Sequence, residues 1–175
     1  MTDSTTPRSA LVLGGMASGK SAFAEALCLD SGLRPIYLAT GRAGDGEMAE
    51  RIERHRRRRG DMWQTIEEPL DLETVLARNA GAGAIILVDC LTLWLTNLMM
   101  VERSIEPVAA NLVACVGRLE GPVVFVSNEV GLGVVPMDAM SRAFVDHAGR
   151  LHQRLAAAVE RVVLVSAGLP HQLKP

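Results

Sequence analysis

Eight residues, Gly-Gly-Met-Ala-Ser-Gly-Lys-Ser over positions 14–21, constrain the fold of this chain more than any other feature. They follow the apolar run 10–13 and precede a stretch that is typical of a helix over 20–30. Glycines permit close backbone approach, so successive N–H groups can point at one anion, and the N-terminus of the following helix adds partial positive charge. The spacing predicts a phosphate-binding loop made of Gly14, Gly15, Met16, Ala17, Ser18, Gly19, Lys20 and Ser21.

Two side chains of this loop have distinct expected roles. Lys20 would reach the β and γ phosphates of a nucleotide, and the Ser21 hydroxyl would hold Mg²⁺. Only two of the 18 Lys and Arg residues are lysines, so a lysine inside the loop stands out against an arginine background. The alternative, a glycine-rich turn without a ligand, is disfavoured by the apolar run before the loop and the helical stretch after it.

One carboxylate, Asp89, follows the apolar run 84–88 and is the candidate partner of Ser21 at the metal. Ligands bind at the carboxyl ends of parallel strands, and a carboxylate there can bind Mg²⁺ directly or through water. Taken alone, Asp89 could equally cap the next helix. Together with the glycine loop, its position favours the metal role.

Short apolar runs alternate with helical stretches along the chain. The runs are apolar on both faces, which is typical of strands covered by helices on each side, and they cover 10–13, 35–39, 84–88, 122–127 and 161–166. The expected helices cover 20–30, 45–59, 70–79, 91–102, 106–119 and 137–160. The pattern predicts an α/β fold with a mostly parallel sheet and helices on both faces. We expect a single domain over 9–175, after a disordered polar tail over 1–8.

Composition and charge argue against several classes of protein. With 18 Lys plus Arg against 20 Asp plus Glu, the net charge of −2 does not suit a general nucleic-acid binder. The apolar runs are shorter than the roughly 20 residues of a membrane span, and the polar N-terminus does not resemble a signal peptide, so we expect a cytoplasmic protein. Three widely spaced cysteines in apolar sequence predict reduced core thiols at Cys28, Cys90 and Cys115.

A run of arginines surrounds one histidine in the expected helix 45–59. At 100° per residue, Met48, Ile52 and His55 project from nearly one face, so His55 is expected to point inward. The ordinary interpretations are a core histidine and a solvated arginine face. The charge density nevertheless suits the oxygens of a triphosphate, which could be bound by Arg54, Arg56, Arg57, Arg58 and Arg59.

The same arginines would disfavour protonation of His55 and keep its imidazole nucleophilic near neutral pH. Attack on the α-phosphorus of a nucleoside triphosphate would release pyrophosphate and leave a nucleotidyl-histidine, which splits one displacement into two. Two rival interpretations stay open. One is a small-molecule or nucleotide kinase without a covalent intermediate, and the other is a nucleotide-switched module whose arginine helix docks an acidic partner or RNA.

Taken together, these residues resemble the bifunctional adenosylcobinamide kinase / adenosylcobinamide-phosphate guanylyltransferase family of cobalamin biosynthesis. The resemblance covers nearly the whole chain and rests on stretches over 13–25, 37–41, 45–48, 51–56, 63–67, 88–92, 96–98, 127–136 and 148–155. It implies a RecA-like sheet with one antiparallel strand and association as a homotrimer. Met16 and Ala17 stand where the family pattern has Ala-Arg, so a phosphate contact from an arginine side chain is absent there.

By this resemblance, His55 matches the position that forms the guanylyl-histidine. The positions expected to line the GTP site are Thr40, Gly41, Arg42, Arg56, Arg57, Arg58, Arg59, Glu67 and Asp89. The implied cofactors are GTP, ATP and Mg²⁺, and the implied substrates are the corrinoid adenosylcobinamide and its phosphate. Phosphate would pass to the aminopropanol hydroxyl, and GMP from GTP would then pass to that phosphate, giving adenosylcobinamide-GDP and pyrophosphate.

Two pairs of polar residues are open to more than one interpretation. Asn128 and Glu129 come at the end of a strand and either orient the substrate or form a polar turn. His147 and His152 are five apart on the last helix, a poor spacing for joint metal binding, and are expected to be surface or packing residues. No base for the substrate hydroxyl is evident from the sequence.

Overall fold

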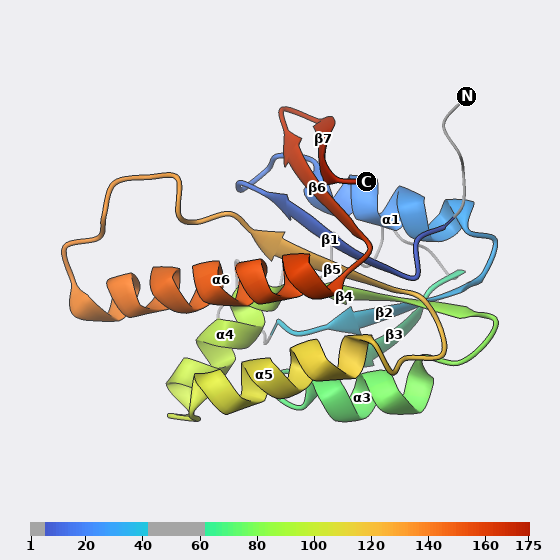
Figure 1. Ribbon diagram of the computed structural model, residues 1–175, viewed down its shortest axis with the longest axis horizontal. Helices are drawn as coiled ribbons and strands as arrows, with labels where there is room; N and C mark the ends of the chain where they lie inside the picture. Colours follow the sequence, from blue (N-terminus) through green and yellow to red (C-terminus); the bar gives the residue numbers. More distant parts are fainter. Residues whose placement is uncertain (1–5, 42–61) are drawn as a thin grey trace.

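A computed structural model describes residues 6–41 and 62–175 of the protein (Figure 1). Within these residues, seven strands form one sheet in the order β3-β2-β4-β5-β1-β6-β7. All neighbouring strands are parallel except β7, which runs antiparallel to β6. The strands are β1 (Ser9–Gly14), β2 (Arg34–Ala39), β3 (Gln64–Glu67), β4 (Ala84–Asp89), β5 (Val123–Asn128), β6 (Arg161–Ser166) and β7 (Leu169–Lys174). The expected α/β fold with a mostly parallel sheet and one antiparallel strand is confirmed.

Helices cover both faces of the sheet, as expected. One face carries α1 (Lys20–Asp30), which contacts β1, β4, β5 and β6. The other carries α3 (Leu72–Asn79), α4 (Leu91–Met100), α5 (Ile105–Val116) and α6 (Ala139–Ala158), which pack on the sheet and on one another. Figure 1 shows α1 above the sheet and the other four helices below it. The expected helix 45–59 lies outside the described residues.

The central strands are buried along almost their whole length, which explains why they are apolar on both faces. Every residue of β1 is buried, and so are five of the six residues of β4 and of β5. Alternate side chains enter two separate cores. Leu11, Val88 and Phe125 belong to the core under α3, α4, α5 and α6, whereas Val12 and Val124 belong to the core under α1.

Two strands, β3 and β7, were not predicted from the sequence. Both lie at the edges of the sheet, where one side of the strand has no partner among the described strands. The four residues of β3 are exposed or half-buried, and β7 contains Pro170 and is exposed over five of its six residues. Proline is tolerated at sheet edges, and exposed strands need no apolar alternation, so neither segment has the usual sequence pattern of a strand.

Arg8, the last residue of the expected tail, is hydrogen-bonded to residues far away in the sequence. Its backbone N–H donates to a Glu160 carboxylate oxygen at 2.7 Å, and its carbonyl accepts from the N–H of Val123. These bonds extend the pairing at the start of β1 and β5. Arg8 is therefore hydrogen-bonded to the folded part of the chain, and the expected boundary between tail and domain stays a prediction.

The order of the strands determines which residues lie beside the phosphate loop. Because β5 is the direct neighbour of β1, Gly14 pairs with Asn128, and the Gly14 carbonyl accepts from the N–H of Glu129 at 3.0 Å. Asp89 ends β4, which lies beyond β5, and is in register with Val126. Two strand spacings of about 4.8 Å each therefore separate the backbone of Asp89 from β1.

Candidate nucleotide-binding site

The phosphate loop connects β1 to α1 through backbone conformations that ordinary side chains seldom adopt. Gly19 has a φ of 95°, which glycine tolerates, and Ala17 has a φ of 56°. The loop is closed by a hydrogen bond from the Ser18 N–H to the Gly15 carbonyl at 3.2 Å, and the Ser18 carbonyl accepts from the N–H of Gly168 at 2.8 Å. The link to Gly168, which lies in the turn between β6 and β7, fixes the loop against a second part of the sheet.

At the start of the loop, Gly14 is required by close packing. A Cβ atom there would lie 2.4 Å from the Ser18 hydroxyl oxygen and 2.6 Å from the Val165 carbonyl oxygen. Gly15 has nothing within 4 Å of the corresponding position. Gly14 therefore lets the backbone pass closely between Val165 of β6 and Ser18 of the loop. Gly15 faces open space.

The loop lysine is positioned by the fold. Lys20 is the first residue of α1 and is 7% exposed, and its ammonium donates to the Gly15 carbonyl at 3.1 Å. The Ser18 hydroxyl is buried and has no hydrogen-bond partner among the described residues. Buried polar groups are usually hydrogen-bonded, so this hydroxyl is ready to take a partner that the protein does not supply. A charged lysine and an unsatisfied hydroxyl on one loop suit an oxyanion ligand.

The donor set expected for Mg²⁺ consists of oxygen atoms. Ser21 lies in the first turn of α1 and is half-buried, and Asp89 is half-buried with its Oδ2 accepting from the Tyr37 hydroxyl at 2.9 Å. Mg²⁺ usually takes one or two protein oxygens and fills its other positions with water and substrate phosphates. One hydroxyl and one carboxylate fit that chemistry. With β5 between β4 and β1, a contact through water suits Asp89 better than a direct one.

A buried network joins β2, β4, α4 and β5 at this edge of the sheet. The Thr40 hydroxyl accepts from the Cys90 N–H at 2.8 Å and donates to the Cys90 carbonyl at 2.7 Å. The Cys90 thiol contacts the Thr92 hydroxyl at 2.8 Å, and the Asn128 amide donates to the same hydroxyl at 2.8 Å. The Asn97 amide donates to the Thr40 carbonyl at 2.7 Å. These contacts fix the relative positions of three strand ends beside the candidate site.

Cys90 is a buried structural thiol. Burial raises the pKa of its thiol, the neighbouring Asp89 carboxylate raises it further, and the hydrogen bond to Thr92 acts in the opposite direction. Burial likewise raises the pKa of Cys28 to about 12 and that of Cys115 to about 11. All three cysteines are free and buried, which confirms the prediction of core thiols.

Of the other residues expected to line a GTP site, some are described and some are not. Thr40 is fully buried, and the network described above engages its hydroxyl and its carbonyl. Gly41 is half-buried next to it, and Glu67 is exposed at the end of β3. The remaining expected residues, Arg42, His55, Arg56, Arg57, Arg58 and Arg59, lie outside the described residues. The roles of all these residues stay predictions.

A second polar cluster at this edge was not recognised as a unit from the sequence. The Ser127 hydroxyl and His152 Nε2 are 2.7 Å apart, and His152 Nδ1 lies 4.0 Å from a Glu129 carboxylate oxygen. Ser127 and His152 are 0% and 6% exposed. His152 is therefore buried, as expected for a packing residue. Its pairing with Ser127 joins residues 25 positions apart, and no local sequence signal indicates it.

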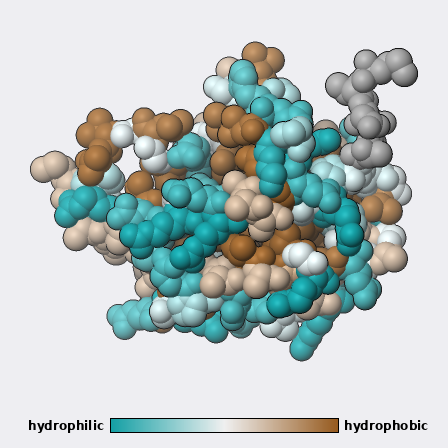
Figure 2. Space-filling model, viewed as in Figure 1, coloured by the Kyte–Doolittle hydropathy of each residue, from teal (hydrophilic) through white to brown (hydrophobic). Residues whose placement is uncertain are grey.

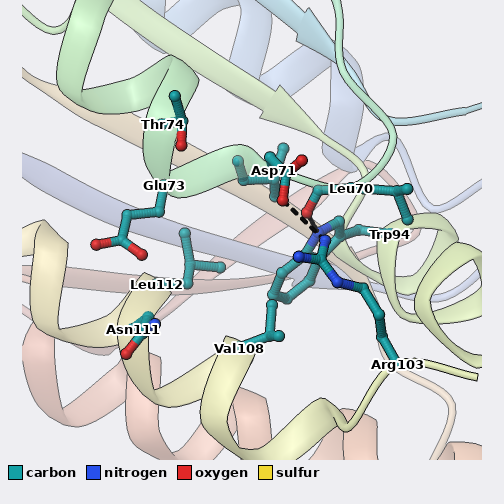
Figure 3. A pocket seen from close by; sticks show the side chains of 10 residues that line it. Leu70, Asp71, Glu73, Thr74, Trp94, Arg103, Val108, Asn111 and Leu112 are labelled. Carbon is teal, nitrogen blue, oxygen red and sulfur yellow. Dashed lines mark hydrogen bonds and ion pairs between the residues drawn. The ribbon is translucent and has the colours of Figure 1, made fainter.

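Away from the loop, a hollow of about 90 Å³ lies among α3, α4 and α5 (Figure 3). Within it, Arg103 Nη1 donates to Asp71 Oδ1 at 2.8 Å, and the Trp94 indole N–H donates to the Leu70 carbonyl at 2.8 Å. Its lining contains none of the residues expected at the nucleotide site. The hollow is therefore a different place from the candidate site.

An exposed apolar loop leads from β5 to α6. Four of its apolar side chains are 71–96% exposed: Leu132, Val134, Val135 and Met137. Figure 2 shows a brown, hydrophobic group at the upper left, where Figure 1 draws this loop. The loop begins directly after Asn128 and Glu129, so it extends from the same edge of the sheet as the phosphate loop.

Two features are absent from the described part of the chain. No group of three or more His, Cys, Asp or Glu side chains there could hold a metal ion. In 6–41 and 62–175, no helix has the length and apolar character that crossing a membrane requires.

The chain is similar to known proteins over nearly its whole length. A protein from Pseudomonas aeruginosa named bifunctional adenosylcobalamin biosynthesis protein CobP is 52% identical, over 94% of this chain and 96% of that protein. The bifunctional adenosylcobalamin biosynthesis protein CobU of Escherichia coli is 38% identical over 94% and 98%. Among solved structures, the flagellar accessory protein FlaH from Methanocaldococcus jannaschii is similar in fold. Its TM-score is 0.52, with 10% identity over 97% of this chain and 78% of that one.

The model of one protein family matches residues 10–173, which include the phosphate loop, the strand ends beside it and all but the last residue of β7. Together with relatives that are 38–52% identical over nearly their whole length, this match determines the family. The chain belongs to the cobinamide kinase / cobinamide phosphate guanyltransferase family.

Proposed function

We propose that this chain catalyses two successive steps of cobalamin biosynthesis at one nucleotide site. The first transfers phosphate from ATP or GTP to the hydroxyl of adenosylcobinamide. The second transfers GMP from GTP to the resulting phosphate and releases pyrophosphate. The observation that carries the proposal is the buried Lys20, fixed on the phosphate loop of a chain that matches the family over residues 10–173.

The first step depends mainly on positioning and charge. Phosphoryl transfer asks for little covalent help from the protein, so the work lies in holding the phosphates and stabilising the charge that develops on them. The loop supports this with the Lys20 ammonium and the N-terminus of α1. Ser21 and Asp89 would hold Mg²⁺, which when bound supplies positive charge to the triphosphate oxygens.

The second step is assigned to His55, with the arginines at positions 56–59 and Arg42 binding the triphosphate. An imidazole that attacks the α-phosphorus forms a phosphorus–nitrogen bond and releases pyrophosphate, and the phosphate of the corrinoid then displaces the histidine. The support is the sequence pattern of an arginine run around one histidine, within the part of the chain that the family model matches. Thr40, Gly41 and Glu67 are proposed to border the same nucleotide.

The partners follow from this chemistry. We assign GTP, ATP and Mg²⁺ as cofactors and the corrinoid as substrate, and we expect no nucleic-acid partner. A homotrimer in the cytoplasm remains the expected state of the enzyme. The net charge of −2 supports the absence of a nucleic-acid role, because a general binder carries a basic surface.

The decisive experiment incubates the full chain with GTP labelled at the α-phosphate. We expect label on the protein that is labile in acid and stable in alkali, as a phosphorus–nitrogen bond should be, and no label on the His55→Ala variant. The exposed His171 on β7 provides the matched control, because His171→Ala should label like the wild type. Addition of adenosylcobinamide phosphate should discharge the label into adenosylcobinamide-GDP.

Other outcomes would support the rival interpretations. Transfer of the γ-phosphate to the corrinoid without any protein label would leave a kinase without a covalent histidine. Binding of an acidic partner or RNA that weakens steeply with salt, with no turnover of either nucleotide, would indicate a nucleotide-switched module.

A further inference from the structure

The acid that directly follows the strand next to the phosphate loop has no role in the functions assigned above. Glu129 follows β5, and its N–H donates to the Gly14 carbonyl at 3.0 Å, so its backbone is bonded directly to the first residue of the loop. Asp89 and Glu67 lie one and three strands farther from β1. Of the carboxylates at the ends of the described strands, Glu129 therefore lies closest to the loop in strand order.

The Glu129 side chain is held from two sides. Its Oε1 accepts from the N–H of Gly131 at 2.6 Å, and its Oε2 lies 4.0 Å from Nδ1 of the buried His152. The second distance is longer than a hydrogen bond, so this interaction is electrostatic in the described state. The Glu129 side chain is 22% exposed, so the carboxylate keeps access to a ligand at the edge of the sheet.

Behind Glu129, His152 is fixed by a third residue. The fully buried Ser127 hydroxyl lies 2.7 Å from His152 Nε2. If this hydroxyl donates to Nε2, the neutral ring carries its proton on Nδ1, which is the atom that faces Glu129. Burial lowers the pKa of His152, while the Glu129 carboxylate acts to raise it. The Ser127 hydroxyl thus orients the His152 imidazole, and the imidazole in turn orients the Glu129 carboxylate.

We propose that Glu129 is the catalytic base of the kinase step and that His152 and Ser127 are its positioning residues. This inference rests on the proposed function, because it assigns the group that the phosphoryl acceptor needs. A general base must lie within hydrogen-bond reach of the hydroxyl it deprotonates. The end of β5 pairs with Gly14, the first residue of the loop that is proposed to hold the phosphates.

The proposed step balances as follows. Glu129 takes the proton of the acceptor hydroxyl while that oxygen forms a bond to the γ-phosphorus. The bond between the γ-phosphorus and the bridging oxygen breaks, and its electron pair leaves with the nucleoside diphosphate. The protonated Glu129 then releases its proton to solvent, and the base is restored.

The structural alternative is that Glu129 only caps its own turn through Gly131 and fills space beside His152. The two roles differ in what they predict. A cap contributes to stability alone, whereas a base lowers the barrier of one reaction and leaves nucleotide binding in place. The appropriate test is therefore a comparison of kcat with KM and with stability.

The experiment measures transfer of labelled γ-phosphate to adenosylcobinamide by the full chain. We expect Glu129→Gln to lower kcat by about 100-fold or more, the range typical of general base catalysis, with the KM for nucleotide within about threefold of wild type. Glu120→Gln, at an exposed position before β5, is the matched control and should keep the wild-type kcat. A kcat of Glu129→Gln within threefold of wild type overturns the proposal. An inactive wild type overturns the proposed function instead.

The positioning role is tested by two substitutions of His152. Asparagine can keep an N–H close to the place of Nδ1, facing Glu129, whereas glutamine places its amide closer to Nε2 and Ser127. We expect His152→Asn to retain more of the kinase kcat than His152→Gln at equal stability. If activity follows the unfolding midpoint in both variants, His152 is structural. Should Glu129→Gln fail to fold, Glu129→Asp replaces it, with a kcat loss of roughly tenfold expected and a wild-type kcat contradicting the base role.

Discussion

Thr40 and Cys90 exchange two hydrogen bonds across neighbouring strand ends, with one hydroxyl serving as both donor and acceptor. The hydroxyl oxygen lies 2.8 Å from the Cys90 nitrogen and 2.7 Å from the Cys90 carbonyl oxygen. Both residues are buried, Thr40 completely. The regular pairing of β2 and β4 ends at Ala39 and Asp89. Just beyond it, the Thr40 side chain bonds the Cys90 backbone in place of a backbone partner.

Replacement of Thr40 by valine removes this exchange while nearly preserving shape. Two buried backbone groups of Cys90 would lose their partner, and each unsatisfied group costs about 1–3 kcal/mol. We expect the free energy of unfolding of Thr40→Val to fall by roughly 2–4 kcal/mol in urea titrations. Thr40→Ser keeps the hydroxyl, loses one methyl group and should cost only about 1 kcal/mol. Equal losses in the two variants would show that the hydroxyl bonds contribute little.

The first two glycines of the phosphate loop should differ in their tolerance of alanine. A Cβ on Gly14 would lie 2.6 Å from the Val165 carbonyl oxygen, a backbone atom that cannot move aside cheaply, whereas a Cβ on Gly15 meets nothing within 4 Å. Overpacking of this kind costs about 1–3 kcal/mol. We expect Gly14→Ala to lower the thermal unfolding midpoint and Gly15→Ala to leave it within error. The same calorimetric measurement on both variants checks this, and an unchanged midpoint for Gly14→Ala would contradict it.

The two lysines of the chain provide a matched pair for testing the nucleotide site. Lys20 is buried in the phosphate loop, whereas Lys174 donates to carbonyls at the end of α6, including that of Ala156. Lys20→Met should lower both γ-phosphate transfer and α-phosphate labelling by on the order of 100-fold, because both reactions use the same bound triphosphate. Lys174→Met removes a charge that stabilises a helix C-terminus, so it should lower stability and leave nucleotide affinity unchanged. Loss of only one activity in Lys20→Met would argue for two separate nucleotide sites.

The buried parts of the fold were predictable because burial imposes a sequence pattern. The strands 10–13 and 84–88 are apolar on both faces, which indicated a parallel sheet between layers of helices, and the helix over 20–30 was predicted with its observed ends. Exposed edge strands impose no such pattern. The strands β3 and β7 are not predictable for this reason, although Thr65 of β3 belongs to a stretch that resembles the family.

The phosphate loop was predictable from local spacing, but its surroundings depend on strand order. The sequence indicates that Asp89 ends a central strand, and it does not indicate that β5 separates that strand from β1. Likewise, the contact between Ser127 and His152 joins a strand to a helix across 25 positions. Long-range pairings of this kind leave no periodic signal, so they follow only from the three-dimensional arrangement.

The burial of His152 predicts that the free energy of unfolding depends on pH in a range above that in which carboxylates titrate. Because burial lowers its pKa below the ordinary value of 6.5, the unfolded chain binds more protons than the folded protein just below that pH. The free energy of unfolding should therefore be highest above pH 6.5 and fall as the pH drops from 6.5 toward the folded pKa. The Glu129 carboxylate opposes this trend and reduces it without changing its sign.

The measurement follows the free energy of unfolding from about pH 7.5 to about pH 5.5, above the range in which ordinary carboxylates titrate. His152→Asn should flatten the slope in this window, because asparagine does not titrate. His171→Asn, at an exposed position, should retain the slope of the wild type. A slope in His152→Asn as steep as in the wild type would mean that another group takes up the proton. The pKa of the imidazole between Ser127 and Glu129 would then be the same in the folded and the unfolded protein.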